Sequence, residues 1–271
     1  MKRRAAAAKI NLALVVGPRR EDGKHELVTV YQRVGLADRV ELGLAGENVV
    51  DGFRGDTLVS RALHALTAET VERFRARIAK RIPVGAGLGG GSADAATALQ
   101  LGNALAGSRL PGRRLHELGS RLGADIPFFL QDGPQLGEGD GTLLSPLDLP
   151  QDYWILLALP RDGVKRSTAE VYARFDARRG ERGFAERRDA LRRALAAVRR
   201  PRGLAALPAN DLAGSPLAPE LIRLGAFRAD VTGAGPVVYG LFHHRAAAQR
   251  AESELRPHAR QTWLTAPAWY V

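Results

Sequence analysis

The sequence of 271 residues contains no cysteine, which excludes disulfide bonds and cysteine-ligated metals and favours a cytoplasmic location. No stretch approaches the run of about 18 apolar residues that a membrane span requires. The basic N-terminus is not followed by the apolar segment of a secretory signal. With 45% hydrophobic residues, the chain is long enough to bury a core in one large domain or two smaller ones. We therefore expect a soluble globular protein with no membrane partner.

Aromatic residues are also scarce, at 6% of the sequence, although the net charge of +11 would favour nucleic-acid binding. Much of the positive charge lies between Arg174 and Arg202, where acidic residues dilute it. This segment lacks the platform of interleaved aromatic residues that stacks bases. We interpret it as a solvated helical surface and expect no nucleic-acid partner.

Lysine is rare, since only five of the 40 basic residues are lysines and 35 are arginines. A compact ammonium can act as a point charge against a phosphate or hydroxyl, which a planar guanidinium does not replace. Lys9 and Asn11 alternate with apolar residues in the segment 9–16, which is the two-residue period of a half-buried strand. The two polar side chains then share one face. Taken alone, this pattern favours an edge strand that exposes its polar residues to water.

The pattern of apolar residues predicts a mixture of strands and helices. A turn with an Asp-Gly pair at residues 20–25 separates the first strand from an apolar run at 27–34, which predicts a hairpin. Helical spacing is found at 57–68 and in the segment before Asp125, and Asn210 with Asp211 is interpreted as a helix cap. Further strands are expected at 40–44, 74–82, 154–159 and 237–242.

A glycine-rich turn is the most informative segment of the chain. Five glycines occur within residues 85–91, between a predicted strand and an Ala/Leu-rich helix at 95–106. Glycines let the backbone approach a ligand closely, and the N-terminus of a helix favours an anion. A merely flexible loop is a weak explanation, because so many glycines are costly in chain entropy. The turn therefore predicts a phosphate site.

Two common phosphate-binding motifs do not account for this turn. Gly85, Gly87 and Gly90 form a G-x-G-x-x-G pattern, but the region about 20 residues later offers arginines instead of the acid of a dinucleotide site. A Walker A loop ends in Gly-Lys-Ser/Thr, whereas no lysine precedes Ser92.

The turn instead resembles the phosphate motif of the galactokinase, homoserine kinase, mevalonate kinase and phosphomevalonate kinase (GHMP) superfamily. The similarity runs from Pro83 to Ser92. The segment GLGGGSADAA is most similar to the corresponding motif of the 4-diphosphocytidyl-2-C-methyl-D-erythritol kinases, a family of non-mevalonate isoprenoid biosynthesis. Motifs of that family also occur in the same order at residues 8–12, 22–25, 123–129, 210–212 and 232–236. The resemblance therefore covers nearly the whole chain.

This resemblance implies an α+β fold of two domains with the active site in the cleft between them. Residues 1–150 would form the N-terminal ATP-binding domain and residues 151–271 the C-terminal domain. The implied activity is phosphorylation of the 2-hydroxyl of 4-diphosphocytidyl-2-C-methyl-D-erythritol by ATP and Mg²⁺. A kinase of another hydroxyl, as on homoserine or mevalonate, and a non-catalytic ligand-binding relative are the alternatives.

The resemblance also assigns the phosphoryl-transfer residues. Asp125 would take or orient the proton of the attacking hydroxyl, and Lys9 would stabilise the developing oxyanion. Ser92 would touch the metal-bound phosphate, and no other metal contact is expected. The ATP cradle would consist of Pro83, Gly85, Gly87, Leu88, Gly89, Gly90, Gly91 and Ser92.

The acceptor side follows from the same comparison. His25 would read the edge of a cytidine ring, Tyr172 would stack on it, and Thr168 would lie near the diphosphate. Lys24 stands where the family usually has a tyrosine, so one face of the cytosine clamp is lost, or is replaced by a cation over the ring or against the diphosphate. The remaining residues expected to bind substrate are Asn11, Gly233 and Gly235.

Overall fold

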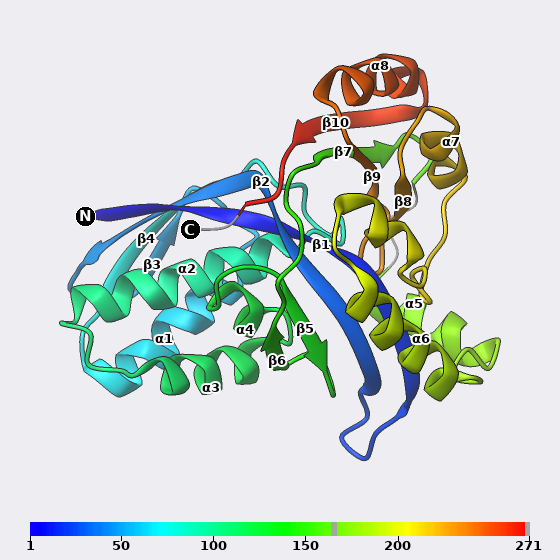
Figure 1. Cartoon of the computed structure of the whole chain (residues 1–271). Coiled ribbons are helices and arrows are strands. Elements are labelled where there is room, and N and C mark those ends of the chain that lie inside the picture. The colour runs from blue at the N-terminus through cyan, green and yellow to red at the C-terminus, as the bar shows by residue number, and fades with distance from the viewer. Residues whose placement is uncertain (164–166, 269–271) are drawn as a thin grey trace.

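The computed structural model describes residues 1–163 and 167–268, which form two antiparallel-rich sheets with helices packed against them (Figure 1). The first sheet has the order β3-β4-β2-β5-β6, with β1 paired to β2, and the second has the order β10-β7-β9-β8. The strands of the first sheet are β1 (Lys2–Arg19), β2 (His25–Leu44), β3 (Val49–Asp51), β4 (Phe74–Ala79), β5 (Gln135–Glu138) and β6 (Leu143–Pro146). Those of the second are β7 (Trp154–Pro160), β8 (Arg228–Val231), β9 (Val238–Phe242) and β10 (Ala259–Thr265).

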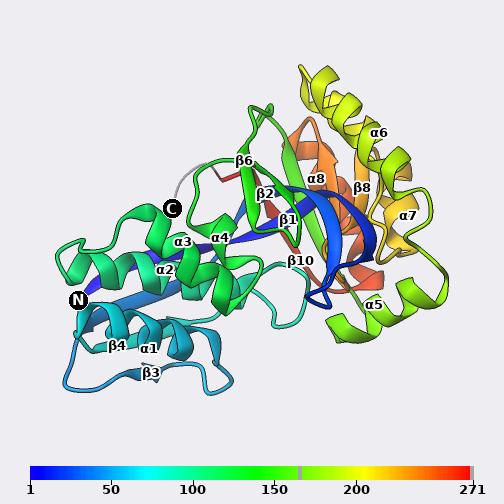
Figure 2. The same cartoon turned by 90° about the horizontal axis from the view of Figure 1, so that it is seen from below.

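The helices surround these sheets in two groups (Figure 2). The first group packs on the first sheet through a core that includes Leu63, Phe74, Leu99 and Phe128. Its members are α1 (Leu58–Thr70), α2 (Gly90–Leu105), α3 (Gly112–Leu122) and α4 (Ile126–Phe129). The second group is α5 (Thr168–Ala177), α6 (Phe184–Ala197), α7 (Leu217–Arg223) and α8 (Arg245–Leu255), with the 3-10 turns Pro201–Ala206 and Arg256–His258.

A long hairpin of β1 and β2 runs through the molecule (Figure 1). Arg19 is paired with His25 across the predicted turn, which confirms the hairpin. The strands expected separately at 27–34 and 40–44 are one strand of 20 residues, because β2 stays paired with β1 beyond the interruption at Gly35. A Cβ at Gly35 would lie 2.7 Å from Thr265 Oγ1, so a glycine lets the second sheet approach the strand there.

Strand β1 is buried on both faces between residues 6 and 17, so the expectation of a half-buried strand was wrong. Ile10 and Leu12 enter a core cluster that also contains Ile155, Leu157 and Tyr239 of the second sheet. On the opposite side, β1 meets α2 and the glycine turn. Its polar side chains therefore lie inside the protein and need polar partners.

The other expected elements are observed with shifted ends. The helix at 57–68 is α1, and the strand at 74–82 is β4, which ends at Ala79. Helix α2 begins at Gly90, five residues before the expected start, because the last glycines of the turn adopt helical geometry. In the described part of the chain, no helix is long and apolar enough to cross a membrane.

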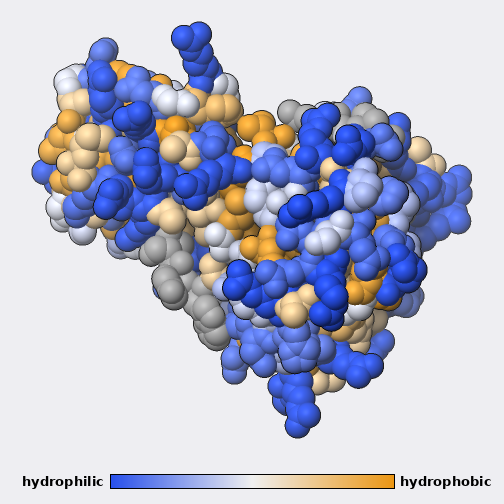
Figure 3. All heavy atoms as spheres, turned by 90° about the horizontal axis from the view of Figure 1, so that it is seen from above, coloured by the Kyte–Doolittle hydropathy of each residue, from blue (hydrophilic) through white to orange (hydrophobic). Residues whose placement is uncertain are grey.

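The arginine-rich segment forms the end of α5, helix α6 and the following 3-10 turn. The face of the molecule in Figure 3 is largely hydrophilic, with apolar side chains in small separate groups. The domain boundary expected at residue 150 stays a prediction. One hydrophobic core cluster contains side chains from both sheets.

Candidate functional site

Four segments distant in sequence surround a cavity of about 700 Å³. These segments are the β1–β2 hairpin, the glycine turn before α2, the turn at Asp125 and the loop after β8. The start of α5 closes one side of the cavity. Most of the predicted site residues line this cavity, namely Lys9, Asn11, Lys24, His25, Gly85, Gly87, Gly89, Ser92, Asp125, Thr168, Tyr172, Gly233 and Gly235.

The glycine turn needs its glycines for two reasons. Gly85, Gly87 and Gly89 have φ angles of 68°, 80° and 68°, in the left-handed region that side chains with a Cβ disfavour. A Cβ at Gly87 would also lie 2.2 Å from the Thr232 carbonyl oxygen. The turn leads directly into α2, whose first N–H groups have no acceptor within the helix. It therefore presents a cradle that suits a phosphate.

Four residues of the predicted cradle do not line the cavity, namely Pro83, Leu88, Gly90 and Gly91. The Leu88 side chain is buried in the core, and its carbonyl accepts a hydrogen bond of 3.0 Å from the Lys9 backbone N–H. A Cβ at Gly90 would lie 2.9 Å from Ile82 Cγ2. Leu88 thus fixes the turn against β1, and Gly90 allows it to pack closely on Ile82, in the segment after β4.

A buried charge cluster lies behind the turn. Lys80 Nζ donates to carboxylate oxygens of Asp38 and Asp94, and both acids are almost fully buried. Burial raises the pKa of Asp94 to about 7, against the opposing effect of Lys80. Asp94 lies in the first half of α2 and Lys80 just after β4, so the cluster ties the helix to the sheet.

Lys9 and Asp125 are neighbours in the wall of the cavity. Lys9 Nζ lies 3.6 Å from Asp125 Oδ2 and donates a hydrogen bond of 2.7 Å to Asn11 Oδ1. The Asn11 amide nitrogen in turn donates to Thr29 Oγ1 at 2.7 Å. Lys9 is only 3% exposed, whereas the Asp125 side chain is 32% exposed. The ammonium is therefore held by its partners, and the carboxylate is open to the cavity.

Tyr31 is a further member of this group that the sequence did not reveal. Its hydroxyl donates to Asp125 Oδ1 at 3.2 Å, and its ring stacks on Phe128 at 4.9 Å. Burial, followed by the charge of Asp125, raises the pKa of Tyr31 well above its usual value, so the phenol stays protonated. Tyr31 is the cross-strand partner of Asn11. The register of the hairpin is thus the signal that would have identified it.

The turn at Asp125 is held by a buried cation. Arg33 Nη2 donates to the carbonyls of Phe129 at 2.9 Å and Gln131 at 2.7 Å, at the end of α4. Its guanidinium also lies 5.4 Å from the centre of the Phe128 ring. Strand β2 therefore positions both Tyr31 and the short helix that begins immediately after Asp125.

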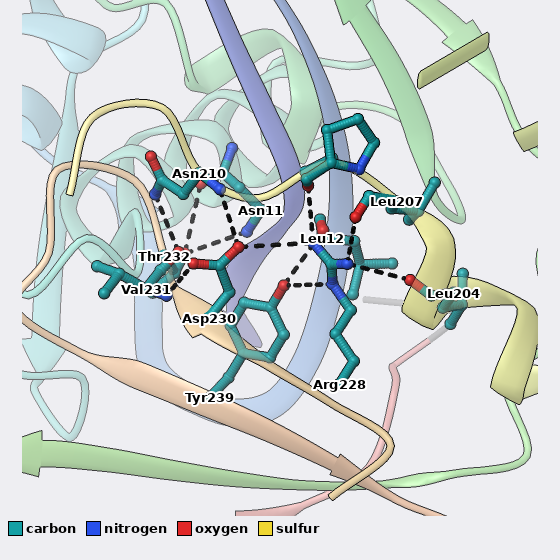
Figure 4. Close-up of polar contacts among 12 residues, drawn as sticks. Asn11, Leu12, Leu204, Leu207, Asn210, Arg228, Asp230, Val231, Thr232 and Tyr239 are labelled. Atoms are coloured by element: carbon teal, nitrogen blue, oxygen red, sulfur yellow. Dashed lines mark hydrogen bonds and ion pairs between the residues drawn. The ribbon is translucent and has the colours of Figure 1, made fainter. Parts of the chain in front are cut away.

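The loop after β8 approaches the glycine turn and β1. Thr232 Oγ1 accepts from the Asn11 backbone N–H at 3.1 Å and donates to the Gly87 carbonyl at 3.2 Å. Asn210 does not cap a helix, contrary to our expectation (Figure 4). Its side-chain nitrogen donates to the carbonyls of Val231, the last residue of β8, and Gly233 in the following loop. Asp211 likewise binds the Val16 N–H instead of a helix end.

A buried network supports this loop from below (Figure 4). Arg228 donates to the Tyr239 hydroxyl and to the carbonyls of Leu204 and Leu207. The Tyr239 hydroxyl donates to the Leu12 carbonyl at 3.2 Å. The second sheet is therefore hydrogen-bonded to the strand that carries Lys9.

The opposite end of the cavity is aromatic and charged. His25 is 6% exposed, and its ring stacks on Tyr172 with a centroid distance of 4.8 Å. Lys24 forms an ion pair with Asp140. Burial would raise the pKa of Asp140, but hydrogen bonds from Lys24 and Thr142 hold it below its usual value. A histidine in a predicted turn would usually be solvated, but His25 is packed into the cavity wall.

No group of three or more His, Asp or Glu side chains that could hold a metal occurs among residues 1–163 and 167–268. A divalent ion at this cavity would accordingly need oxygen ligands from a bound phosphate, as is usual for Mg²⁺. Ser92, the residue predicted to touch the metal-bound phosphate, lines the cavity in the first turn of α2.

Sequence comparison finds two matching domain families. Residues 57–133 match the family described as GHMP kinases N terminal domain, and residues 219–260 match GHMP kinases C terminal. The chain is 37% identical to the 4-diphosphocytidyl-2-C-methyl-D-erythritol kinase of Geobacter sulfurreducens, over 96% of each chain. It has the same identity and coverage with the enzyme of that name from Moorella thermoacetica.

Solved structures give a consistent result. A crystal structure of 4-(cytidine 5'-diphospho)-2C-methyl-D-erythritol kinase matches with a TM-score of 0.79 and 31% identity, over 98% of this chain and 99% of that one. The mevalonate kinase of Methanococcus jannaschii matches with a TM-score of 0.77 over 98% of both chains, but with 13% identity. The latter likeness concerns the fold alone.

Proposed function

This chain belongs to the family of 4-diphosphocytidyl-2-C-methyl-D-erythritol kinases, and from that premise we propose that it phosphorylates the 2-hydroxyl of this cytidine diphosphate derivative. It is an ATP-dependent small-molecule kinase with the two-domain α+β fold of the GHMP kinases. The observation that carries the proposal is the pairing of Lys9 with Asp125 beside a glycine cradle in one cavity.

ATP is proposed to bind with its phosphates on the glycine turn. Gly87 and Gly89 allow the backbone to approach them, and the N-terminus of α2 favours their negative charge. Mg²⁺ fits the site only as an ion bound to the phosphates, with Ser92 as the protein group next to them. It would neutralise phosphate charge there.

Asp125 and Lys9 have different roles in the proposed phosphoryl transfer. Asp125 accepts or orients the proton of the substrate hydroxyl, since its carboxylate is open to the cavity. Lys9 stabilises the negative charge that develops on the attacking oxygen. Tyr31 donates to one oxygen of Asp125 and so orients the other toward the hydroxyl. Little covalent chemistry is required, because positioning and charge neutralisation account for most of phosphoryl-transfer catalysis.

The cytidine end of the substrate is proposed to occupy the aromatic end of the cavity. His25 and Tyr172 would contact the base, and Thr168 would lie beside the diphosphate. Lys24, held by Asp140 on the cavity wall, would supply a cation in place of the family's usual tyrosine. Asn11, Gly233 and Gly235 would line the path between the base and the reacting hydroxyl. A cytoplasmic location completes the proposal, in keeping with a chain that has no cysteine to pair in an oxidising compartment.

The deciding experiment incubates the purified protein with ATP, Mg²⁺ and 4-diphosphocytidyl-2-C-methyl-D-erythritol. We expect release of ADP and a product heavier by one phosphate, identified by mass spectrometry and by ³¹P resonance. Asp125→Asn serves as the inactive control. Absence of ADP above background, or turnover of mevalonate or homoserine with the cytidyl compound inert, would overturn the proposal.

A further inference from the structure

Asp176, which the sequence motifs do not single out, lies directly behind the proposed base-reading histidine. Its Oδ1 is 2.7 Å from His25 Nε2. Tyr172, Phe175 and Asp176 are spaced i, i+3 and i+4 on α5, so they share the helix face that packs on the hairpin. Tyr172 stacks on the His25 ring and Phe175 meets it edge-on at 5.8 Å. One helix face thus encloses the imidazole on three sides.

The other oxygen of Asp176 is also occupied. Arg19 donates to Oδ2 from Nε at 3.1 Å and from Nη2 at 2.9 Å. Burial would raise the pKa of Asp176, but the hydrogen bonds from His25 and Arg19 hold it below its usual value. The carboxylate is therefore ionised at neutral pH and can only accept hydrogen bonds.

An ionised carboxylate at Nε2 determines where the imidazole carries its proton. In the neutral ring one nitrogen is protonated and the other accepts a hydrogen bond. Because Asp176 accepts, the neutral form of His25 carries its proton on Nε2 and keeps a lone pair on Nδ1. Among the described residues, Nδ1 has no hydrogen-bond partner, and His25 lines the cavity. The ring thus offers an acceptor to a ligand.

We propose that Asp176 is a positioning residue that fixes this tautomer of His25 and thereby selects cytosine over uracil. An acceptor at Nδ1 pairs with the amino group at position 4 of cytosine, whereas uracil has a carbonyl oxygen there. Arg19 keeps the carboxylate facing the ring. The inference rests on the proposed function, since it concerns the base of the substrate.

The test compares Asp176→Asn with the unchanged protein on the cytidyl substrate and on its uridyl counterpart. An asparagine can donate to Nε2, which moves the ring proton to Nδ1 and removes the acceptor. We expect KM for the cytidyl substrate to rise about tenfold, with kcat and KM for ATP changed by less than about twofold. The preference for cytidyl over uridyl substrate should fall by about the same factor. Asp176→Glu, which keeps a carboxylate, should recover part of it.

Two controls separate positioning from loss of structure. Asp189→Asn removes an exposed carboxylate on α6 away from the cavity and should leave all constants unchanged. In a His25→Gln background, Asp176→Asn should add no further loss, because there is no tautomer to fix. An unchanged base preference in Asp176→Asn, or equal losses for both bases and for ATP, would overturn the inference.

Binding measurements keep the inference distinguishable from the activity. Calorimetry with CDP and UDP requires no turnover, so it reports base selection even if the unchanged protein releases no ADP. Tighter binding of CDP that is lost in Asp176→Asn supports the inference whatever the kinase assay shows. Equal binding of both nucleotides by the unchanged protein refutes it, even where the cytidyl substrate is phosphorylated.

Discussion

Single side chains in this protein act through partners that lie far away in sequence. Lys9 is almost fully buried, yet its ammonium is satisfied by Asn11 and Asp125. The pairing explains how a chain with few lysines keeps one inside its core, because an unpaired buried charge would be costly. A motif identifies Lys9 and Asp125 from sequence. It does not identify Tyr31, which depends on the register of the hairpin.

Asp125→Asn should abolish most of the activity without preventing ATP binding. The amide cannot accept the hydroxyl proton, so kcat should fall by about 10² to 10⁴-fold. KM for ATP should change by less than about threefold, because the glycine cradle is intact. Steady-state kinetics combined with calorimetric ATP binding measure both quantities. Retention of more than a tenth of the activity would exclude the proposed role.

Tyr31→Phe tests the residue that the sequence did not reveal. The ring still stacks on Phe128, but the donor to Asp125 is lost. We expect kcat to fall about tenfold, because the Asp125 carboxylate loses the donor that orients it, and a hydrogen bond to a charged group contributes roughly 1.5–3 kcal/mol. Thermal stability should change little, since the Asp125 side chain is 32% exposed and water replaces the lost donor. Kinetics and thermal unfolding of the two proteins provide the comparison. A large loss of stability with unchanged kcat per folded molecule would show that the hydroxyl is structural only.

At the scale of elements, the glycine turn is constrained by its neighbours as much as by a ligand. Gly87→Ala should clash with the Thr232 carbonyl and force a left-handed φ on a side chain. We expect a destabilisation of about 1–3 kcal/mol and a strong loss of ATP affinity. Gly112→Ala is the matched control, since nothing lies within 4 Å of its Cβ position and its φ is not positive. Equal effects of the two changes in urea unfolding and ATP binding would contradict this interpretation.

The cluster of Asp38, Lys80 and Asp94 makes the attachment of α2 dependent on pH. The pKa of Asp94 is raised to about 7 in the folded protein, against about 4 in an unfolded chain. Asp94 therefore favours folding when protonated, and this contribution is lost as the pH rises through about 7. Relative to Asp94→Asn, the unchanged protein should lose on the order of 2 kcal/mol of unfolding free energy between about pH 5 and pH 8.5. Urea unfolding at both pH values measures it, and a pH-independent difference would refute it.

Sequence patterns located most helices and strands, because their apolar spacing is local. They failed where tertiary contacts decide the outcome. The expected half-buried strand at residues 9–16 is buried on both faces, since the second sheet and α2 cover it. Two expected strands proved to be the single strand β2. Asn210 binds loop carbonyls in place of a helix end, which no local pattern indicates.

At the scale of the whole molecule, both sheets share a core. The cluster around β1 contains Ile10 and Val30 of the first sheet and Ile155, Leu157 and Leu241 of the second. We therefore expect one cooperative unfolding transition, although the fold has two halves. Tryptophan fluorescence, which reports the half that contains Trp154 and Trp263, should change at the same urea concentration as the far-UV circular dichroism. Two separate midpoints would show that the halves unfold independently.

The hydrogen bond between Asn11 and Thr232 joins residues 221 positions apart, and it has a consequence for biosynthesis. The strand that carries Lys9 leaves the ribosome long before its partners in the second sheet exist. At about 5–20 residues per second, that interval lasts on the order of 10 to 40 seconds. During it, the apolar face of β1 that packs on the second sheet is uncovered, and we expect it to be accessible to chaperones. The phosphoryl-transfer site is thus completed only near the end of translation. A chain that terminates prematurely would expose an apolar strand face and would lack a complete active site.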